Sequence, residues 1–209
     1  MEAAKELDDD LLSATARANL GVIYRSVGES EKAVENFELC MEMARKADAK
    51  QLIAMAYCNL GNVYNSAGKS EQALEMIEQS RNVFVHVGDA CGEAKTYLNM
   101  GECYLAQQKY RKSIEMFDSA LPILIQVGDT LGQVSTLLQS GQSYLMIALK
   151  SEKGSEEQVT LAQSAWARFD KTLSMTSQLS KLHVQVLCTW LMMTSHDLMC
   201  MRTKRCSIS

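Results

Sequence analysis

The sequence predicts an all-α protein built from stacked helical hairpins. Good helix formers are abundant, and only one proline and eleven glycines interrupt the 209 residues. Four glycines recur at intervals of forty positions, and a tyrosine follows each of them three residues later: Gly21, Gly61, Gly101 and Gly141. Each copy of this pattern holds two apolar helical runs with short turn signals between them. A lone hairpin of this kind cannot bury its apolar face, so the repeats are expected to stack on one another.

The first two repeats show the hairpin pattern most clearly. Their first helical runs end near Gly28 and Gly68, and glycine suits the left-handed turn that often ends a helix. Ser30 and Ser70 follow two positions later and are expected to cap the second runs, each with a glutamate behind it.

The connections between repeats carry a different signal. The second runs of repeats two and three end at Gly88 and Gly128. The aspartates that follow, Asp89 and Asp129, are expected to cap the next first helix. Pro122 lies inside the second run of repeat three, where a kink is expected.

The fourth repeat departs from this spacing. Its first run continues without a turn to Lys150, and the break comes only at residues 151–157. The second-helix motif returns with Ala165 and Phe169, about twelve positions late. The expected repeats of the array, residues 10–180, are 10–48, 49–88, 89–128 and 129–180.

Three further segments flank the array. Residues 1–9 are expected to be the end of a preceding helix or a connector, so the array would start within a repeat. Residues 181–201 are expected to form an apolar helix with little polar face, which leaves self-association open, and residues 202–209 are expected to be a basic tail.

The order L-G-x2-Y followed by A-x3-F resembles the tetratricopeptide repeat (TPR). The period of forty exceeds the usual length of about 34, and the closing proline of the usual motif is missing. Long repeats of this kind are similar to those of the Pins/LGN adaptors, kinesin light chain and rapsyn. The resemblance implies a right-handed superhelix, an α-solenoid, whose first helices line a concave groove. HEAT repeats share the period but lack the L-G-x2-Y pattern.

One row of the expected groove holds a carboxamide in every repeat: Asn19, Asn59, Asn99 and Gln139. A carboxamide both donates and accepts hydrogen bonds, so such a row can pair with a peptide backbone whatever its side chains. The resemblance implies this use, because related adaptors hold extended peptides on an asparagine ladder. The alternative is that these side chains brace neighbouring repeats. The other groove residues that we assign to peptide binding are Arg25, Asn62, Asn65, Lys95, Glu102 and Gln142.

Other functions find little support. Ala18 and Val22 stand where chaperone-binding arrays carry a lysine and an asparagine, which excludes recognition of a chaperone tail. The motifs of phosphate-binding loops, serine hydrolases and zinc peptidases are missing, so we expect no enzyme, catalytic residue or cofactor. The histidines and cysteines lack paired ligands at tight spacing, so no metal site is expected.

Charge and the C-terminal tail bear on partners. A net charge of −4 argues against nucleic acid, and seven scattered cysteines without a signal peptide indicate reduced thiols in the cytoplasm. The last four residues, beginning at Cys206, fit a C-a-a-X prenylation signal beside a small basic patch. The sequence therefore favours an adaptor that binds an extended segment of a protein partner. The alternative is a prenylated, membrane-associated scaffold that self-associates.

Overall fold

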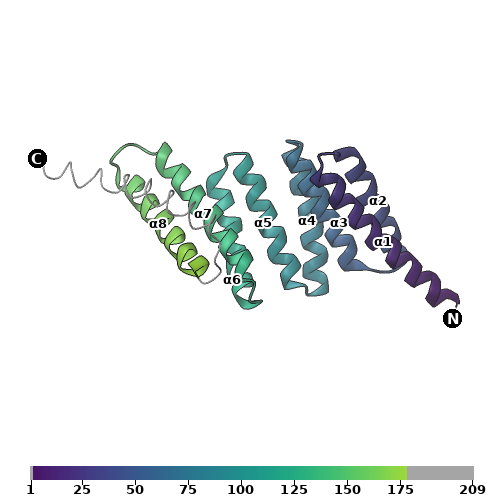
Figure 1. The fold of residues 1–209 in the computed structure, drawn as a ribbon. Coiled ribbons are helices and arrows are strands. Elements are labelled where there is room, and N and C mark those ends of the chain that lie inside the picture. Colours follow the sequence, from purple (N-terminus) through teal and green to yellow (C-terminus); the bar gives the residue numbers. More distant parts are fainter. Residues whose placement is uncertain (1, 178–209) are drawn as a thin grey trace, which may run out of the picture. The chain divides into compact units, whose positions relative to one another are not determined.

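The fold is all-α within residues 2–177, which are the residues that the computed structural model describes (Figure 1). The helices in this range are α1 (Glu2–Ser26), α2 (Ser30–Lys46), α3 (Lys50–Ser66), α4 (Ser70–Val87), α5 (Ala90–Ala106), α6 (Tyr110–Gln126), α7 (Thr130–Lys150) and α8 (Glu156–Ser177). Short turns join consecutive helices, as the repeat pattern predicts, and the predicted fold class is confirmed for this part of the chain.

The chain divides into two compact units, residues 1–103 and 104–209, with the boundary inside α5. In the first, the N-terminal unit, α1 packs on α2 and α3 packs on α4, while α2 also contacts α3. In the second, the C-terminal unit, α6 packs on α7 and α7 packs on α8. Antiparallel helix pairs are therefore the building blocks of both units.

Left-handed residues end most of these helices. The φ angles at the four glycines expected there are 82°, 74°, 73° and 74°: Gly28, Gly68, Gly88 and Gly128. Asp48 and Gln108 take the same conformation, with φ of 48° and 57°, at turns that carry no glycine. Only glycine adopts this region without steric cost, so these two residues hold a less favourable backbone.

The predicted aspartate caps are present. The backbone N–H of Gly92 donates to Oδ1 of Asp89 at 2.8 Å, and that of Gly132 donates to Oδ1 of Asp129 at 2.9 Å. Each bond satisfies one of the unpaired N–H groups at the start of α5 or α7.

The predicted serine caps are wrong. The helices α2 and α4 begin at Ser30 and Ser70, so the capping positions belong to Glu29 and Lys69, which make no side-chain cap bond. The physical reason is the tightness of the preceding turn. The N–H of Glu29 bonds back to the carbonyl of Tyr24 at 2.9 Å, which leaves one residue between the turn glycine and the next helix.

Two helices are continuous across positions that the sequence singles out, one an expected connector and the other an expected kink. The helix α1 is continuous from Glu2, so residues 2–9 are helical rather than a connector. The helix α6 includes Pro122 and continues to Gln126. Pro122 is exposed, so water can satisfy the carbonyl that proline leaves without a donor.

Glycines mark a close approach of the two helices within a hairpin. A Cβ atom added at these glycines would lie 2.6, 2.5 and 2.6 Å from a large side chain of the second helix. The pairs are Gly21 with Phe37, Gly61 with Ile77, and Gly141 with Phe169. All three partners are fully buried, so these contacts belong to the core. The fourth hairpin therefore makes the same contact as the first, although its partner comes later in the sequence.

None of the helices in the described residues combines the length and apolar character that crossing a membrane requires.

Candidate functional site

The carboxamide row predicted from the sequence occupies four different environments. Asn19 on α1 is exposed, Asn59 on α3 is half-buried, and Asn99 on α5 is buried with 8% of its surface accessible. Gln139 on α7, in the C-terminal unit, is half-buried and donates to Ser135 on its own helix. Asn19 and Asn59 are therefore the members most accessible to a partner.

Asn99 already contacts a neighbouring first helix. Its Nδ2 donates to Sγ of Cys58 at 2.9 Å, and both side chains are buried. This bond joins α5 to α3, which is the bracing role that the sequence analysis left open as the alternative. For Asn99, the donor half of the amide is thus occupied inside the protein.

The thiol of Cys58 marks the place where three first helices approach one another. Burial raises its pKa, while the charge of Lys95, hydrogen bonds with Asn99 and Ser80, and the charge of Arg25 act in the opposite direction. Arg25 belongs to α1 and Lys95 to α5, so cations from both neighbours of α3 surround this point. The thiol stays neutral at ordinary pH, and the surrounding charge is positive.

Two polar atoms on α1 and α3 are buried and have no hydrogen-bond partner among the described residues: Nε of Arg25 and Oδ1 of Asn65. The two residues are forty positions apart and hold equivalent places on α1 and α3. Most buried polar atoms in native proteins are paired, because an unpaired one costs about 1–3 kcal/mol. One atom is a donor and the other an acceptor, so a segment that offers both groups would satisfy the pair.

We call the polar side chains on this side of α1 and α3 the asparagine face. Its members are Asn19, Arg25, Asn59, Asn62 and Asn65. Asn19 is exposed and the other four are half-buried, so each keeps some contact with solvent.

The remaining predicted site residues are more dispersed. Lys95 and Gln142 are exposed, and Glu102 is half-buried near the end of the N-terminal unit. Burial, followed by the negative charge of Glu102, raises the pKa of the Cys103 thiol to about 12. Cys206 lies outside the described residues, as do the apolar segment 181–201 and the basic tail 202–209. In the described part, no group of three or more histidines, cysteines or acids is placed to hold a metal ion.

The repeat pattern did not indicate the central position of Cys58. It also missed Ser80, whose Oγ donates to the carbonyl of Ala54 at 2.7 Å and links α4 to α3 inside the core. A serine at an otherwise apolar core position of the second helix is the signal that indicates such a bond.

Comparison with solved structures shows the same fold. A signal-transduction ATPase of Pyrococcus horikoshii with a tetratricopeptide repeat sensor superposes with a TM-score of 0.73 and 16% identity, covering 89% of this chain and 27% of that one. A kinesin light chain-type protein of Podospora anserina with nearly identical TPR-like repeats gives 0.68 and 12%, covering 91% and 88%. A Rap protein complexed with Competence and Sporulation Factor gives 0.56 and 16%, covering 90% and 54%.

The comparisons by sequence give a family and no individual relative. None of the curated proteins is significantly similar to this chain. The family model described as tetratricopeptide repeat matches residues 12–85 and again residues 51–126, which together make up more than half of the chain. With the repeated glycine contacts and the paired helices, this match shows that the chain belongs to the tetratricopeptide repeat family.

Proposed function

We propose that the protein is an interaction adaptor whose asparagine face binds an extended segment of a partner protein. The observation that carries the proposal is the pair of buried, unpaired polar atoms, Nε of Arg25 and Oδ1 of Asn65. A peptide backbone offers carbonyl and N–H groups side by side, so one segment can accept from Arg25 and donate to Asn65.

The other members of the asparagine face extend this recognition. Asn19, Asn59 and Asn62 each present a carboxamide that can donate to one backbone group and accept from another. Contacts of this kind do not depend on the partner's side chains, so they supply affinity rather than sequence selection. Sequence specificity comes from charge, because the cations Arg25 and Lys95 favour an acidic side chain in the bound segment.

The fold supports a binding role of this kind. The Rap protein, which has a similar fold, forms a complex with Competence and Sporulation Factor. Glu102, Gln139 and Gln142 stay predictions as additional contacts of the bound segment.

A pair of asparagine variants tests the proposal. Peptides are selected from a random phage-displayed library on the wild-type chain and titrated by calorimetry. Asn59→Ala combined with Asn65→Ala should weaken binding by about 1–3 kcal/mol, roughly 5- to 150-fold, because two neutral hydrogen bonds are lost. The matched control is Asn82→Ala, since Asn82 is an exposed asparagine on the second helix α4. Its affinity should equal that of the wild type.

Thermal melts separate binding from bracing. Asn99→Ala should lower the melting temperature, because it removes the bond to Cys58. The double variant should melt close to the wild type, because within residues 2–177 neither Asn59 nor Asn65 has a bond to a neighbouring helix to lose. If the double variant binds every selected peptide as tightly as the wild type, the asparagine face is not the binding site.

A further inference from the structure

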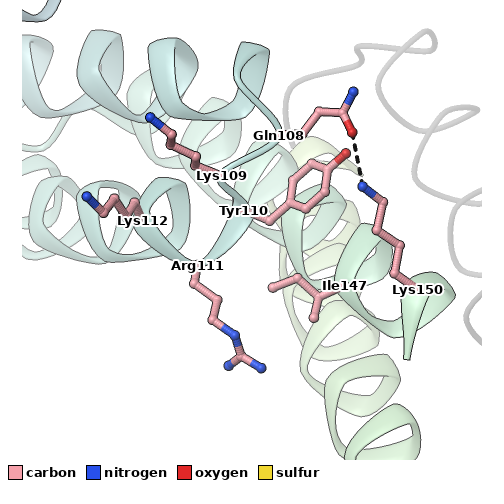
Figure 2. A pocket seen from close by; sticks show the side chains of 7 residues that line it. All are labelled: Gln108, Lys109, Tyr110, Arg111, Lys112, Ile147 and Lys150. Carbon is pink, nitrogen blue, oxygen red and sulfur yellow. Dashed lines mark hydrogen bonds between the residues drawn. The ribbon is translucent and has the colours of Figure 1, made fainter. Parts of the chain in front are cut away.

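A basic pocket of about 480 Å³ opens in the C-terminal unit where the turn before α6 meets the end of α7. Its lining is shown in Figure 2 and consists of Gln108, Lys109, Tyr110, Arg111, Lys112, Ile147 and Lys150. Four of these side chains are cationic and none is acidic. None of them belongs to the groove residues predicted from the sequence.

Lys150 is held in place at one wall of the pocket. Its Nζ donates to Oε1 of Gln108 at 3.0 Å and lies 4.8 Å from the centroid of the Tyr110 ring (Figure 2). Both partners are neutral, so the ammonium charge is positioned without being cancelled. The contact also gives a use to Gln108, which holds a left-handed conformation where the first two repeats have glycine.

The other cations differ in how far they are compensated. Arg111 pairs with Glu157 at 2.7 Å, and both side chains are well exposed. Nζ of Lys109 donates to the neutral Gln107, and Nζ of Lys112 lies 5.6 Å from the ring of Tyr104. Within the described residues, an ion pair thus compensates one of the four cations, while the ammonium groups of Lys109 and Lys112 point away from that of Lys150 (Figure 2).

The charge of this turn is reversed relative to the preceding repeats. The second residue of α2 is Glu31 and that of α4 is Glu71, whereas α6 has Arg111 at the same place. Acidic residues are favourable at the start of a helix and cations are unfavourable. A cluster of cations here costs stability unless an anion joins it.

We propose that this basic pocket binds an acidic side chain of an extended peptide from a partner protein, with the carboxylate at the ammonium group of Lys150 and with Lys109 and Lys112 adding positive charge at the rim. The apolar walls from Tyr110 and Ile147 accommodate the methylene groups of a glutamate. The site is separate from the asparagine face and does not depend on it.

The surrounding charge favours a peptide over a polyanionic surface. Glu157 reaches the pocket through its pair with Arg111, and Glu156 precedes it at the exposed start of α8. The whole chain carries a net charge of −4. A membrane or nucleic acid would meet these carboxylates together with the lysines, whereas one side chain entering the pocket avoids them.

The test uses the full chain and a fluorescein-labelled peptide of glycine and glutamate, measured by fluorescence anisotropy. The pocket variant is Lys109→Gln, Lys112→Gln and Lys150→Gln, three substitutions at the rim that leave the apolar walls intact. It should weaken binding on the order of ten-fold, and the binding should weaken as salt is added. The matched control is Lys46→Gln, Lys50→Gln and Lys171→Gln, which removes the same charge from exposed positions elsewhere. It should stay within about two-fold of the wild type.

Several outcomes would overturn the proposal. One is equal binding of a peptide with glutamine in place of glutamate, and another is no binding of the glutamate peptide by the wild type. A third is an equal loss in the control variant, which would show a net-charge effect. Binding to phosphatidylserine vesicles without binding to the peptide would replace the peptide by a membrane. The loss caused by the pocket variant should be the same when Asn59→Ala and Asn65→Ala are also present, so this test does not depend on the asparagine face.

Discussion

Replacing Gly21 by alanine tests the contact that closes the first hairpin. The new Cβ would lie 2.6 Å from Cε1 of Phe37 and 2.8 Å from Cδ1 and Cζ of the same ring. Carbon atoms pack best at about 3.5–4.0 Å, so the ring has to retreat by roughly 1 Å. Phe37 is fully buried and has little room for such a movement.

The magnitude follows from two opposing contributions. Overpacking a well-filled core costs about 1–3 kcal/mol, while alanine in place of glycine inside a helix contributes about 1 kcal/mol. The net loss expected for Gly21→Ala is therefore about 0–2 kcal/mol. Phe37→Leu makes room for the added methyl group, so the double variant should lose about 1–2 kcal/mol less than the sum of the single variants.

The free energy of unfolding is measured for the four proteins of this double-mutant cycle by urea titration, with circular dichroism as the signal. The four values are compared only if the proteins share the same m value. Gly28 supplies the control cycle, because it has a φ of 82° and no atom within 4 Å of an added Cβ. The cost of Gly28→Ala should be the same with and without Phe37→Leu. If Gly21→Ala and Phe37→Leu are additive within about 0.5 kcal/mol, the close approach at Gly21 does not limit the packing of the hairpin.

Three further predictions concern the thiols and the helix starts. Burial raises the pKa of Cys40 to about 11 and that of Cys103 to about 12. Both thiols should therefore resist alkylation by iodoacetamide at about pH 8, while the exposed Cys91 reacts. Peptide mass spectrometry measures the modification of each cysteine. The same shifts should lower the free energy of unfolding as pH rises from the ordinary thiol value of 9.0 toward about 11, because unfolded thiols ionise first; a flat profile there would contradict this. Asp129→Ala should cost about 1 kcal/mol in urea unfolding, since it removes a cap, whereas Ser30→Ala should change stability by less than about 0.5 kcal/mol. Equal losses for the two would contradict the observed caps.

Much of the fold could be predicted because the repeat pattern reports a contact that recurs. A glycine at a fixed place in each first helix, with a large apolar residue in the second, indicates close helix packing, and Gly61 with Ile77 shows it. The ends of helices were less predictable. Whether Ser30 caps α2 or begins it depends on one residue of turn geometry, which composition does not encode.

Less of the candidate site could be predicted. The helical period places Asn19, Asn59 and Asn99 in one row, but it does not tell how deeply each is buried. The bond from Asn99 to Cys58 depends on the distance between α3 and α5. The basic pocket joins a turn to the end of α7, more than thirty-five positions away, and a repeat pattern carries no information about that pairing.

The spacing of the glycine contacts also bears on the order in which the hairpins form. Gly21 and Phe37 are sixteen positions apart, as are Gly61 and Ile77, whereas Gly141 and Phe169 are twenty-eight apart. The entropy of bringing two chain positions together grows with the logarithm of their separation, so the longer loop costs about 0.5 kcal/mol more. Closure of the fourth hairpin is thereby slowed about two-fold relative to the first two. During folding, nucleation is accordingly favoured at the N-terminal end, with the last helix pair closing late.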